Sequence, residues 1–255
     1  MKNLLISALL LAWFALYANL SAFSQMAFND IRSSSVKISD IVTRNDDSLK
    51  KQFEAKKLTW PAKEIFIRSF KYDRQLEVWV KGENDESFKL FKTYRVCMQS
   101  GTMGPKRMEG DYQIPEGFYY INEFNPNSNY HLSLGLNYPN ASDKILADEA
   151  RPGKAIYIHG NCVSVGCIAI SDEPIEELYT LASHAKEAGQ DFIPVHVFPV
   201  KYNSPKSLEY LTQFTKANPA LNEFAVSLKN AFDYFEAKKE LPVVMINKQG
   251  KYIVD

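Results

Sequence analysis

Residues 155–173, AIYIHGNCVSVGCIAISDE, place one histidine and two cysteines between two short apolar runs. Residues 155–158 form a short apolar run that predicts a buried strand, with His159 at its tip. A second apolar run follows a short loop, and a helix is expected to begin with a cap at Ser171 or Asp172. We therefore expect a strand, a loop, a second strand and a helix in succession.

His159 and Cys167 lie at the two ends of this loop and have the side chains that thiol catalysis uses as base and nucleophile. A thiol is a weak nucleophile when protonated, and a nearby imidazole favours the thiolate. Gly166 allows the backbone to approach a substrate closely. The amides of Gly166 and Cys167 are then candidate donors to a developing oxyanion. A Cys/His pair at this spacing also arises by chance, because a buried cysteine is usually inert.

Other roles for these residues remain open from the sequence. His159, Cys162 and Cys167 could bind zinc, but a fourth ligand and a C-x2-C pair are missing, so no metal or cofactor is expected. A Ser164 nucleophile would depend on the same histidine. The third cysteine, Cys97, makes the count odd, so at least one thiol stays unpaired. A Cys162–Cys167 disulfide would disable the nucleophile and is considered as an oxidised off-state.

The motif HG-x-C-VSVGC-IAI-x-D at residues 159–172 resembles the catalytic motif of the L,D-transpeptidase (YkuD) family, most nearly its YafK-type branch. The resemblance extends upstream to GTMGPKRMEGDYQIPEGFYYI (101–121) and FNPNSNYHLSLGLNYPN (124–140), and it covers about residues 60 to 200. It implies the fold of that family and acyl transfer on bacterial peptidoglycan stem peptides.

By position, the resemblance implies that Cys167 is the nucleophile and His159 the general base. The backbone carbonyl of Gly160 would orient the imidazole. The oxyanion and motif loop would be formed by Ser164, Val165 and Gly166.

Two positions depart from the common family pattern. Many members carry a histidine directly before the GC pair and an arginine two residues after the cysteine, where this chain has Val165 and Ala169. A charge that could hold a substrate carboxylate is therefore missing. The YafK-type branch shares this feature and is associated with hydrolysis of amide links to peptidoglycan. The alternatives to a cross-linking transpeptidase are thus a thiol amidase and a catalytically idle wall-binding module.

The candidate substrate-binding residues lie upstream of the motif. Tyr130, His131 and Tyr138 could line a groove, although aromatic residues in sheets are more often part of the core. Lys106 lies in a Gly- and Pro-rich loop at 100–117, where it could hold carboxylates or be simply solvated. The expected partners are peptidoglycan stem peptides, with a wall-attached protein as a further candidate.

The N-terminal segment predicts export from the cytoplasm. Lys2 and the apolar run 4–20 precede Ala22-Phe23-Ser24, which suits signal-peptidase cleavage before Gln25. The alternative is an uncleaved anchor, but the run is at the short limit for a membrane span. We expect a protein of the periplasm or cell envelope with no stable span after cleavage. Lysine plus arginine and aspartate plus glutamate both number 30, so nothing favours nucleic-acid binding.

The remaining pattern predicts an α+β, mainly β, fold. From Glu64 onward short strands recur at intervals typical of a β-sandwich or barrel. The family resemblance implies that this is the L,D-transpeptidase-like β-sandwich/barrel, and we expect accessory helices at both of its ends. An irregular lead-in at 26–45 precedes a helix that starts at Asp46 or Asp47. His184 is expected to be exposed on a helix. The expected segments are a signal peptide (1–24), a lead-in with an accessory helix (25–58), a catalytic domain (59–200) and a C-terminal helical extension with a closing hairpin (201–255).

Overall fold

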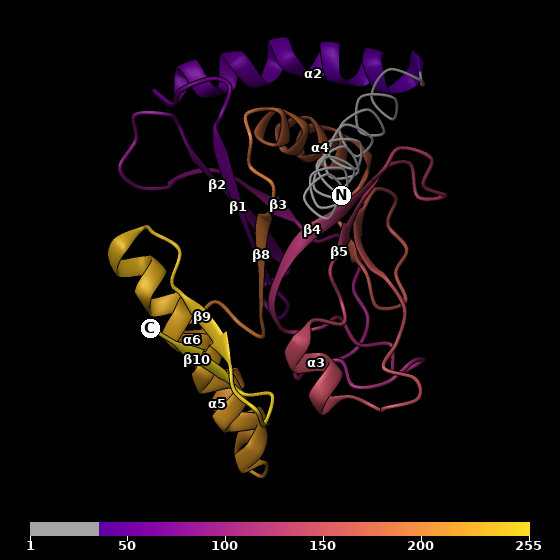
Figure 1. Cartoon of the computed structure of the whole chain (residues 1–255), viewed down its shortest axis with the longest axis vertical. Helices are drawn as coiled ribbons and strands as arrows, with labels where there is room; N and C mark the ends of the chain where they lie inside the picture. The colour runs from indigo at the N-terminus through magenta and orange to yellow at the C-terminus, as the bar shows by residue number, and fades with distance from the viewer. Residues whose placement is uncertain (1–35) are drawn as a thin grey trace, which may run out of the picture. The chain divides into compact units, whose positions relative to one another are not determined.

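The computed structural model describes residues 36–255 (Figure 1). The predicted signal peptide and the first part of the lead-in lie outside the described residues. The chain divides into two compact units, 1–44 and 45–255, and helix α2 (Val36–Ala55) crosses the boundary between them. Within 36–255, no helix combines the length and the apolar character that a membrane crossing requires.

Helix α2 begins earlier than predicted. Residues 36–45 are helical, so the expectation of an irregular lead-in up to residue 45 is wrong for this part. The physical reason is apolar spacing, because Ile38, Ile41 and Val42 continue the i, i+3, i+4 pattern that leads to Leu49 and Phe53. Asp46, predicted as a cap, is inside the helix and accepts a hydrogen bond from His184 Nε2 at 2.6 Å. His184 is consequently mostly buried rather than exposed, with 16% of its side chain accessible.

The core of the second unit is an eight-stranded mixed sheet with strand order β3-β2-β1-β8-β4-β5-β6-β7. The pairs β1–β8 and β6–β7 are parallel, and the other neighbours are antiparallel. The strands are β1 (Glu64–Phe70), β2 (Gln75–Lys81), β3 (Lys89–Arg95), β4 (Gly117–Asn125), β5 (Ser133–Leu136), β6 (Ile156–His159), β7 (Ile168–Ala169) and β8 (Ile193–Phe198). The prediction of an α+β fold with a β-rich catalytic region is confirmed.

The two edges of this sheet meet beside the motif. Met98, just after β3, bridges Ala169 of β7 in antiparallel orientation. The Cys97 amide donates to the Ala169 carbonyl at 2.9 Å, and the Ala169 amide donates to the Met98 carbonyl at 3.4 Å. A single sheet that curls until its edges touch satisfies the edge groups of β7, and it corresponds to the barrel form of the prediction rather than to two packed sheets.

Helix α4 (Asp172–Glu187) follows β7 directly and packs against β1, β5, β6 and β8. It spans almost the whole of the predicted 172–189 helix. Its buried side includes Ile175, Leu178 and Ala182, the stripe expected from the sequence. Helix α4 begins at Asp172, three residues after β7 ends at Ala169. The packing of this helix therefore also holds the motif in place.

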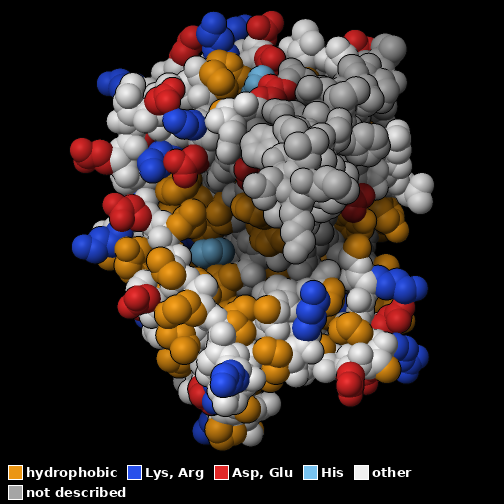
Figure 2. Space-filling model, in the orientation of Figure 1, with side chains coloured by type: hydrophobic (Ala, Val, Ile, Leu, Met, Phe, Trp, Pro, Cys, Tyr) orange, Lys and Arg blue, Asp and Glu red, His pale blue; other side chains and the backbone are white. Residues whose placement is uncertain are grey.

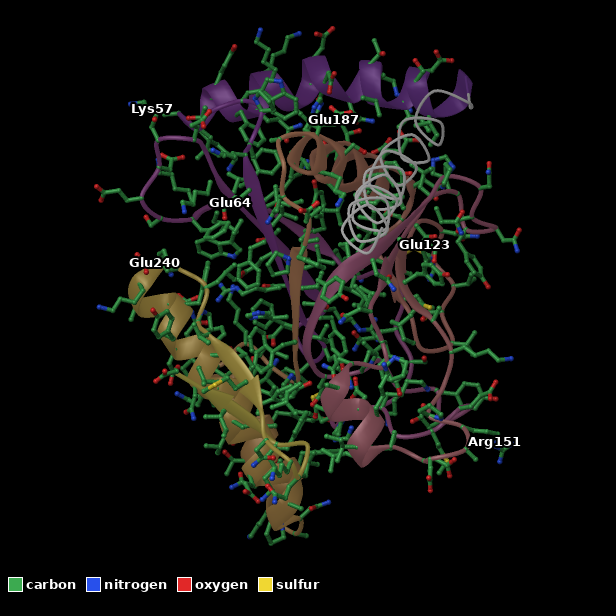
Figure 3. The ribbon with its side chains drawn as sticks, in the orientation of Figure 1. Lys57, Glu64, Glu123, Arg151, Glu187 and Glu240 are labelled. Atoms are coloured by element: carbon green, nitrogen blue, oxygen red, sulfur yellow. A yellow bond between two sulfur atoms is a disulfide. The ribbon has the colours of Figure 1, made fainter. Side chains whose placement is uncertain are left out.

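The C-terminal extension consists of α5 (Pro205–Thr215), α6 (Pro219–Lys238) and a hairpin of β9 (Val244–Ile246) and β10 (Tyr252–Val254), as predicted. Phe235 of α6 packs on Phe66 of β1 with ring centroids 4.8 Å apart. In Figure 3, Glu64 marks the start of β1, and Glu240 follows the end of α6. Hydrophobic side chains are also exposed over this extension (Figure 2), among them Val243, Met245 and Ile253 of the hairpin.

A short helix that the sequence did not predict, α3 (Ala141–Leu146), follows β5. Asn140 and Asp143 form a reciprocal capping box at its start. The Ser142 hydroxyl donates to the Gly250 carbonyl at 2.6 Å, which joins α3 to the C-terminal hairpin turn.

Candidate active site

The register of two parallel strands places the candidate nucleophile and base on one side of the sheet. Ile158 pairs with Ile168, and His159 pairs with Ala169. Because side chains alternate along a strand, Cys167 comes opposite Tyr157 and projects to the same side as His159, whereas Ile158 and Ile168 point into the core.

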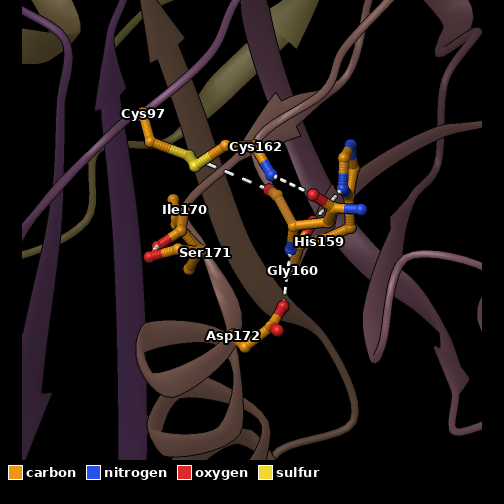
Figure 4. Close-up of a disulfide and its surroundings, with 8 residues drawn as sticks. Cys97, His159, Gly160, Cys162, Ile170, Ser171 and Asp172 are labelled. Atoms are coloured by element: carbon orange, nitrogen blue, oxygen red, sulfur yellow. Dashed lines mark hydrogen bonds between the residues drawn. A yellow bond between two sulfur atoms is a disulfide. The ribbon is translucent and has the colours of Figure 1, made fainter.

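His159 is held in one orientation by its own backbone neighbour. Its side chain is buried, and Nδ1 lies 2.6 Å from the Gly160 carbonyl oxygen (Figure 4). A carbonyl only accepts, so Nδ1 carries the hydrogen and Nε2 keeps its lone pair. The Tyr130 ring covers the imidazole with centroids 4.7 Å apart. Burial lowers the pKa of His159 below its usual 6.5, with the Gly160 hydrogen bond acting in the opposite direction. The imidazole is therefore a neutral acceptor at neutral pH.

Cys167 is a free, partly exposed thiol. Burial raises its pKa above the usual 9.0, while hydrogen bonding from the Tyr157 backbone and the charge of Lys106 act to lower it. Both members of the pair are thus uncharged at neutral pH. This arrangement suits a base that removes the thiol proton as attack proceeds, and not a preformed thiolate–imidazolium pair.

The loop between the strands is closed by Ser164. The Cys167 amide donates to Ser164 Oγ at 3.0 Å, and the same hydroxyl donates to the Cys167 carbonyl at 2.6 Å. Gly166 has φ +114°, and a Cβ at this position would lie 3.3 Å from the Gln113 carbonyl oxygen. The Cys167 amide is therefore engaged in this structure, and it could serve an oxyanion only by leaving Ser164.

A disulfide joins Cys97 to Cys162, which lie 65 positions apart in sequence, with Cα atoms 5.7 Å apart (Figure 4). The Cys162–Cys167 disulfide considered from the sequence is wrong, because Cys162 is already bonded. The zinc alternative fails for the same reason, since a disulfide sulfur is not a thiolate ligand. The odd cysteine count contained the signal: once Cys167 is reserved as a nucleophile, the other two cysteines remain to pair.

The four candidate substrate-binding residues have different surroundings. Tyr130 is 40% exposed above His159. His131 Nε2 lies 2.7 Å from Glu176 Oε1. The Tyr138 ring is buried, and its hydroxyl donates to the Pro152 carbonyl at 2.6 Å. Of these three, Tyr130 therefore presents the most surface next to the imidazole.

Lys106 is also buried and not a solvated loop residue. Its ammonium forms an ion pair with Asp111 and donates to the Met108 carbonyl at 2.9 Å. The positive charge of Lys106 acts to lower the pKa of Cys167, against the larger effect of burial, which raises it. Val165 and Ala169, the two positions that depart from the common family pattern, differ in exposure. Val165 is 69% exposed, while Ala169 is fully buried. An exposed apolar side chain thus stands next to the candidate nucleophile.

The sequence did not identify the part that Asp172 plays. It was expected only as a helix cap, but Ser171 occupies the N-cap position and Asp172 is the first residue of α4. Asp172 Oδ1 accepts a hydrogen bond from the Asn161 amide at 2.7 Å, across the motif loop (Figure 4). The signal available in the sequence was an acidic residue directly after the second strand.

A known protein family matches the region of the chain that contains this site. The model of the L,D-transpeptidase catalytic domain (YkuD) matches residues 66–201. YafK of Escherichia coli (strain K12), whose name assigns it to the L,D-transpeptidases, is 33% identical over 192 residues, which cover 74% of this chain and 73% of the relative.

Two solved structures are similar at 20% identity. The helical cell shape determining protein Pgp2 from Campylobacter jejuni has a TM-score of 0.42, covering 72% of this chain and 73% of that chain. Bd1075 from Bdellovibrio bacteriovorus has a TM-score of 0.41, covering 74% of this chain and 79% of that chain. The matched family model and the identity to YafK together establish that the chain belongs to the L,D-transpeptidase catalytic domain (YkuD) family.

Proposed function

We propose that the protein is a cysteine-dependent acyltransferase that acts on peptidoglycan stem peptides in the periplasm or cell envelope. The observation that carries the proposal is an imidazole whose Nδ1 is fixed on the Gly160 carbonyl, on a strand whose pairing with β7 brings the free thiol of Cys167 to the same side of the sheet. The lone pair of His159 Nε2 is then available to the thiol proton. Family membership supports a cell-wall substrate.

In the proposed mechanism, Cys167 Sγ attacks a stem-peptide carbonyl while His159 Nε2 takes the thiol proton. The amides of Val165 and Gly166 stabilise the oxyanion of the tetrahedral intermediate, and the Cys167 amide joins them only by leaving Ser164. The C–N bond then breaks, His159 protonates the leaving amine, and a thioester on Cys167 remains. An amine acceptor or water attacks this thioester while His159 accepts the proton of the nucleophile. The C–S bond then breaks, and His159 returns the proton to Sγ, which restores the thiol.

Incubation with purified peptidoglycan, followed by mass spectrometry of the muropeptides, tests this proposal. We expect product formation by the wild type and none by Cys167→Ala. His159→Gln should lose most of the rate. The matched control is His184→Gln, at a histidine of α4 that is hydrogen-bonded to Asp46 of α2. Turnover that persists in Cys167→Ala would exclude the proposed nucleophile.

A thiol amidase is the second candidate, and the exposed Val165 favours it. The Val165 side chain carries no charge that could hold a carboxylate of an acceptor stem peptide, so water becomes the competing acceptor. New cross-linked dimers in the muropeptide assay would identify a transpeptidase, and shortened or released stems an amidase. Unchanged muropeptides together with no labelling of Cys167 by a carbapenem would identify an idle wall-binding module.

A further inference from the structure

We infer that Asp172 is a positioning residue for His159 and acts through the peptide unit that joins Gly160 to Asn161. The inference rests on the proposed function, because it assigns a role within the same site. One peptide unit carries both contacts: its carbonyl, from Gly160, accepts from His159 Nδ1 at 2.6 Å, and its N–H, from Asn161, donates to Asp172 Oδ1 at 2.7 Å (Figure 4).

The physical basis is the planarity of the peptide bond. The C=O and N–H of one unit point in opposite directions in one plane, so fixing the N–H fixes the direction of the carbonyl. A carboxylate acceptor makes the Asn161 hydrogen bond a charge-assisted one. Hydrogen bonds in series also polarise one another, so the carboxylate strengthens the acceptor that His159 uses. Asp172 thereby favours the tautomer that leaves Nε2 free for Cys167.

The surroundings show that this contact is built into the fold. A Cβ on Gly160 would lie 2.6 Å from Asp172 Oδ1 and 2.8 Å from the Tyr130 carbonyl oxygen, so only glycine lets the carboxylate approach. Asn161 has φ +56° and Ser171 has φ +67°, two non-glycine residues in the left-handed region, one on each side of the contact. The Asn161 side chain accepts from the Cys162 amide at 2.7 Å, and Cys162 is held by its disulfide.

Ordinary helix capping does not account for Asp172. A capping side chain accepts from amides two or three residues later in its own helix. Asp172 instead accepts from a residue eleven positions earlier, on the motif loop. Glu173, the neighbouring acidic residue in the first turn of α4, carries the same charge at the same helix end and is therefore a matched control.

The first test is the tautomer of His159, read by long-range ¹⁵N–¹H NMR of histidine-labelled protein. The chain has 4 histidines, and His159→Gln assigns the signal. We expect the Nδ1–H form in the wild type, in Glu173→Gln and in Asp172→Asn, whose amide oxygen can accept the same N–H. Asp172→Ala should give a mixture of tautomers. Should this variant fold poorly, Asp172→Ser provides a second truncation.

The second test is kinetic. Misplacing the base should lower kcat of Asp172→Ala by about 10- to 100-fold and leave KM within about twofold. Asp172→Asn should recover most of kcat. A single Nδ1–H tautomer with unchanged kcat in Asp172→Ala would overturn the inference. The NMR readout needs no substrate, so absence of peptidoglycan turnover in every protein, wild type included, would remove the proposed function while the tautomer result still decides the role of Asp172.

Discussion

Ser164 Oγ lies 3.0 Å from the amide nitrogen of Cys167 and 2.6 Å from its carbonyl oxygen. One hydroxyl therefore accepts from and donates to the backbone of the proposed nucleophile. It closes the turn that delivers Cys167 to the start of β7. Its role is to hold the loop, because it satisfies two backbone groups that the short strand leaves unpaired.

Ser164→Ala should impair both activity and stability. The loss of two hydrogen bonds destabilises the fold by about 1–3 kcal/mol, and displacement of Cys167 lowers kcat by at least about tenfold. Ser164→Thr keeps the hydroxyl and should retain most of both. Denaturant unfolding and muropeptide turnover measure the two effects, and an unaffected kcat in the alanine variant would show that the loop holds Cys167 without Ser164.

The Cys97–Cys162 disulfide should be a large contributor to stability. It links residues 65 apart, across the seam where the sheet edges meet. Loop-closure entropy for such a separation gives about 4 kcal/mol, and native disulfides typically contribute about 2–5 kcal/mol. We expect Cys97→Ser/Cys162→Ser to lower the free energy of unfolding by this amount in urea titrations.

The matched control for the disulfide is Cys167→Ala, which removes the third cysteine and leaves the bond intact. Dithiothreitol should destabilise the wild type and Cys167→Ala equally and have no effect on the double serine variant. Equal stability of the oxidised and reduced wild type would contradict the assignment.

The pH dependence of activity follows from the two shifted pKa values. A base acts only when unprotonated, so activity falls as pH drops through the pKa of His159, which burial places below 6.5. The acid limb of kcat/KM should therefore lie below pH 6.5. The rate of Cys167 alkylation by iodoacetamide should still be rising above pH 9.0, because burial raises the thiol pKa. An acid limb above pH 6.5 would contradict a neutral His159 at rest. An alkylation rate that stops rising by pH 8 would contradict a neutral Cys167 at rest.

Local patterns predicted the elements that carry the motif. The apolar run before His159 and the stripe of α4 were sufficient for β6 and for the helix, because both are periodic within the segment itself. Helix α3 was missed because its six residues are too few to show a period, and its contact with Gly250 comes from the far end of the chain. Short elements of this kind depend on tertiary contacts.

The site shows the same limit. That Cys167 and His159 act together stays a prediction from their motif, whereas the partner of Cys162 depends on how the two sheet edges meet, which no local pattern records. Lys106 looks like a solvated loop residue in sequence, and its burial follows from the carboxylate of Asp111 that folds back on it. The contact of Asp172 with Asn161 required the parallel pairing of β6 and β7 to be known first.

His196 should make the fold sensitive to acid. It lies in β8, its ring is packed 4.6 Å from Phe66 and 4.7 Å from Phe118, and its buried Nδ1 has no hydrogen-bond partner within residues 36–255. Burial, and then the charge of Arg68, lower its pKa from 6.5 to about 3. Below pH 6.5 the unfolded chain binds a proton that the folded chain does not, so stability rises with pH up to 6.5.

The neutral His196 therefore stabilises the fold fully above pH 6.5, and this contribution is lost as pH falls toward 3, at up to about 1.4 kcal/mol per pH unit. His196→Phe removes the titrating group and places an apolar ring among apolar rings. We measure the free energy of unfolding by urea titrations between pH 7.5 and 4.5. Below pH 6.5 the wild type should lose stability more steeply than His196→Phe, and the difference between the two slopes should be up to about 1.4 kcal/mol per pH unit. His184→Gln controls for the loss of a histidine elsewhere, and parallel pH dependence in His196→Phe and the wild type would show that His196 is protonated in the folded state.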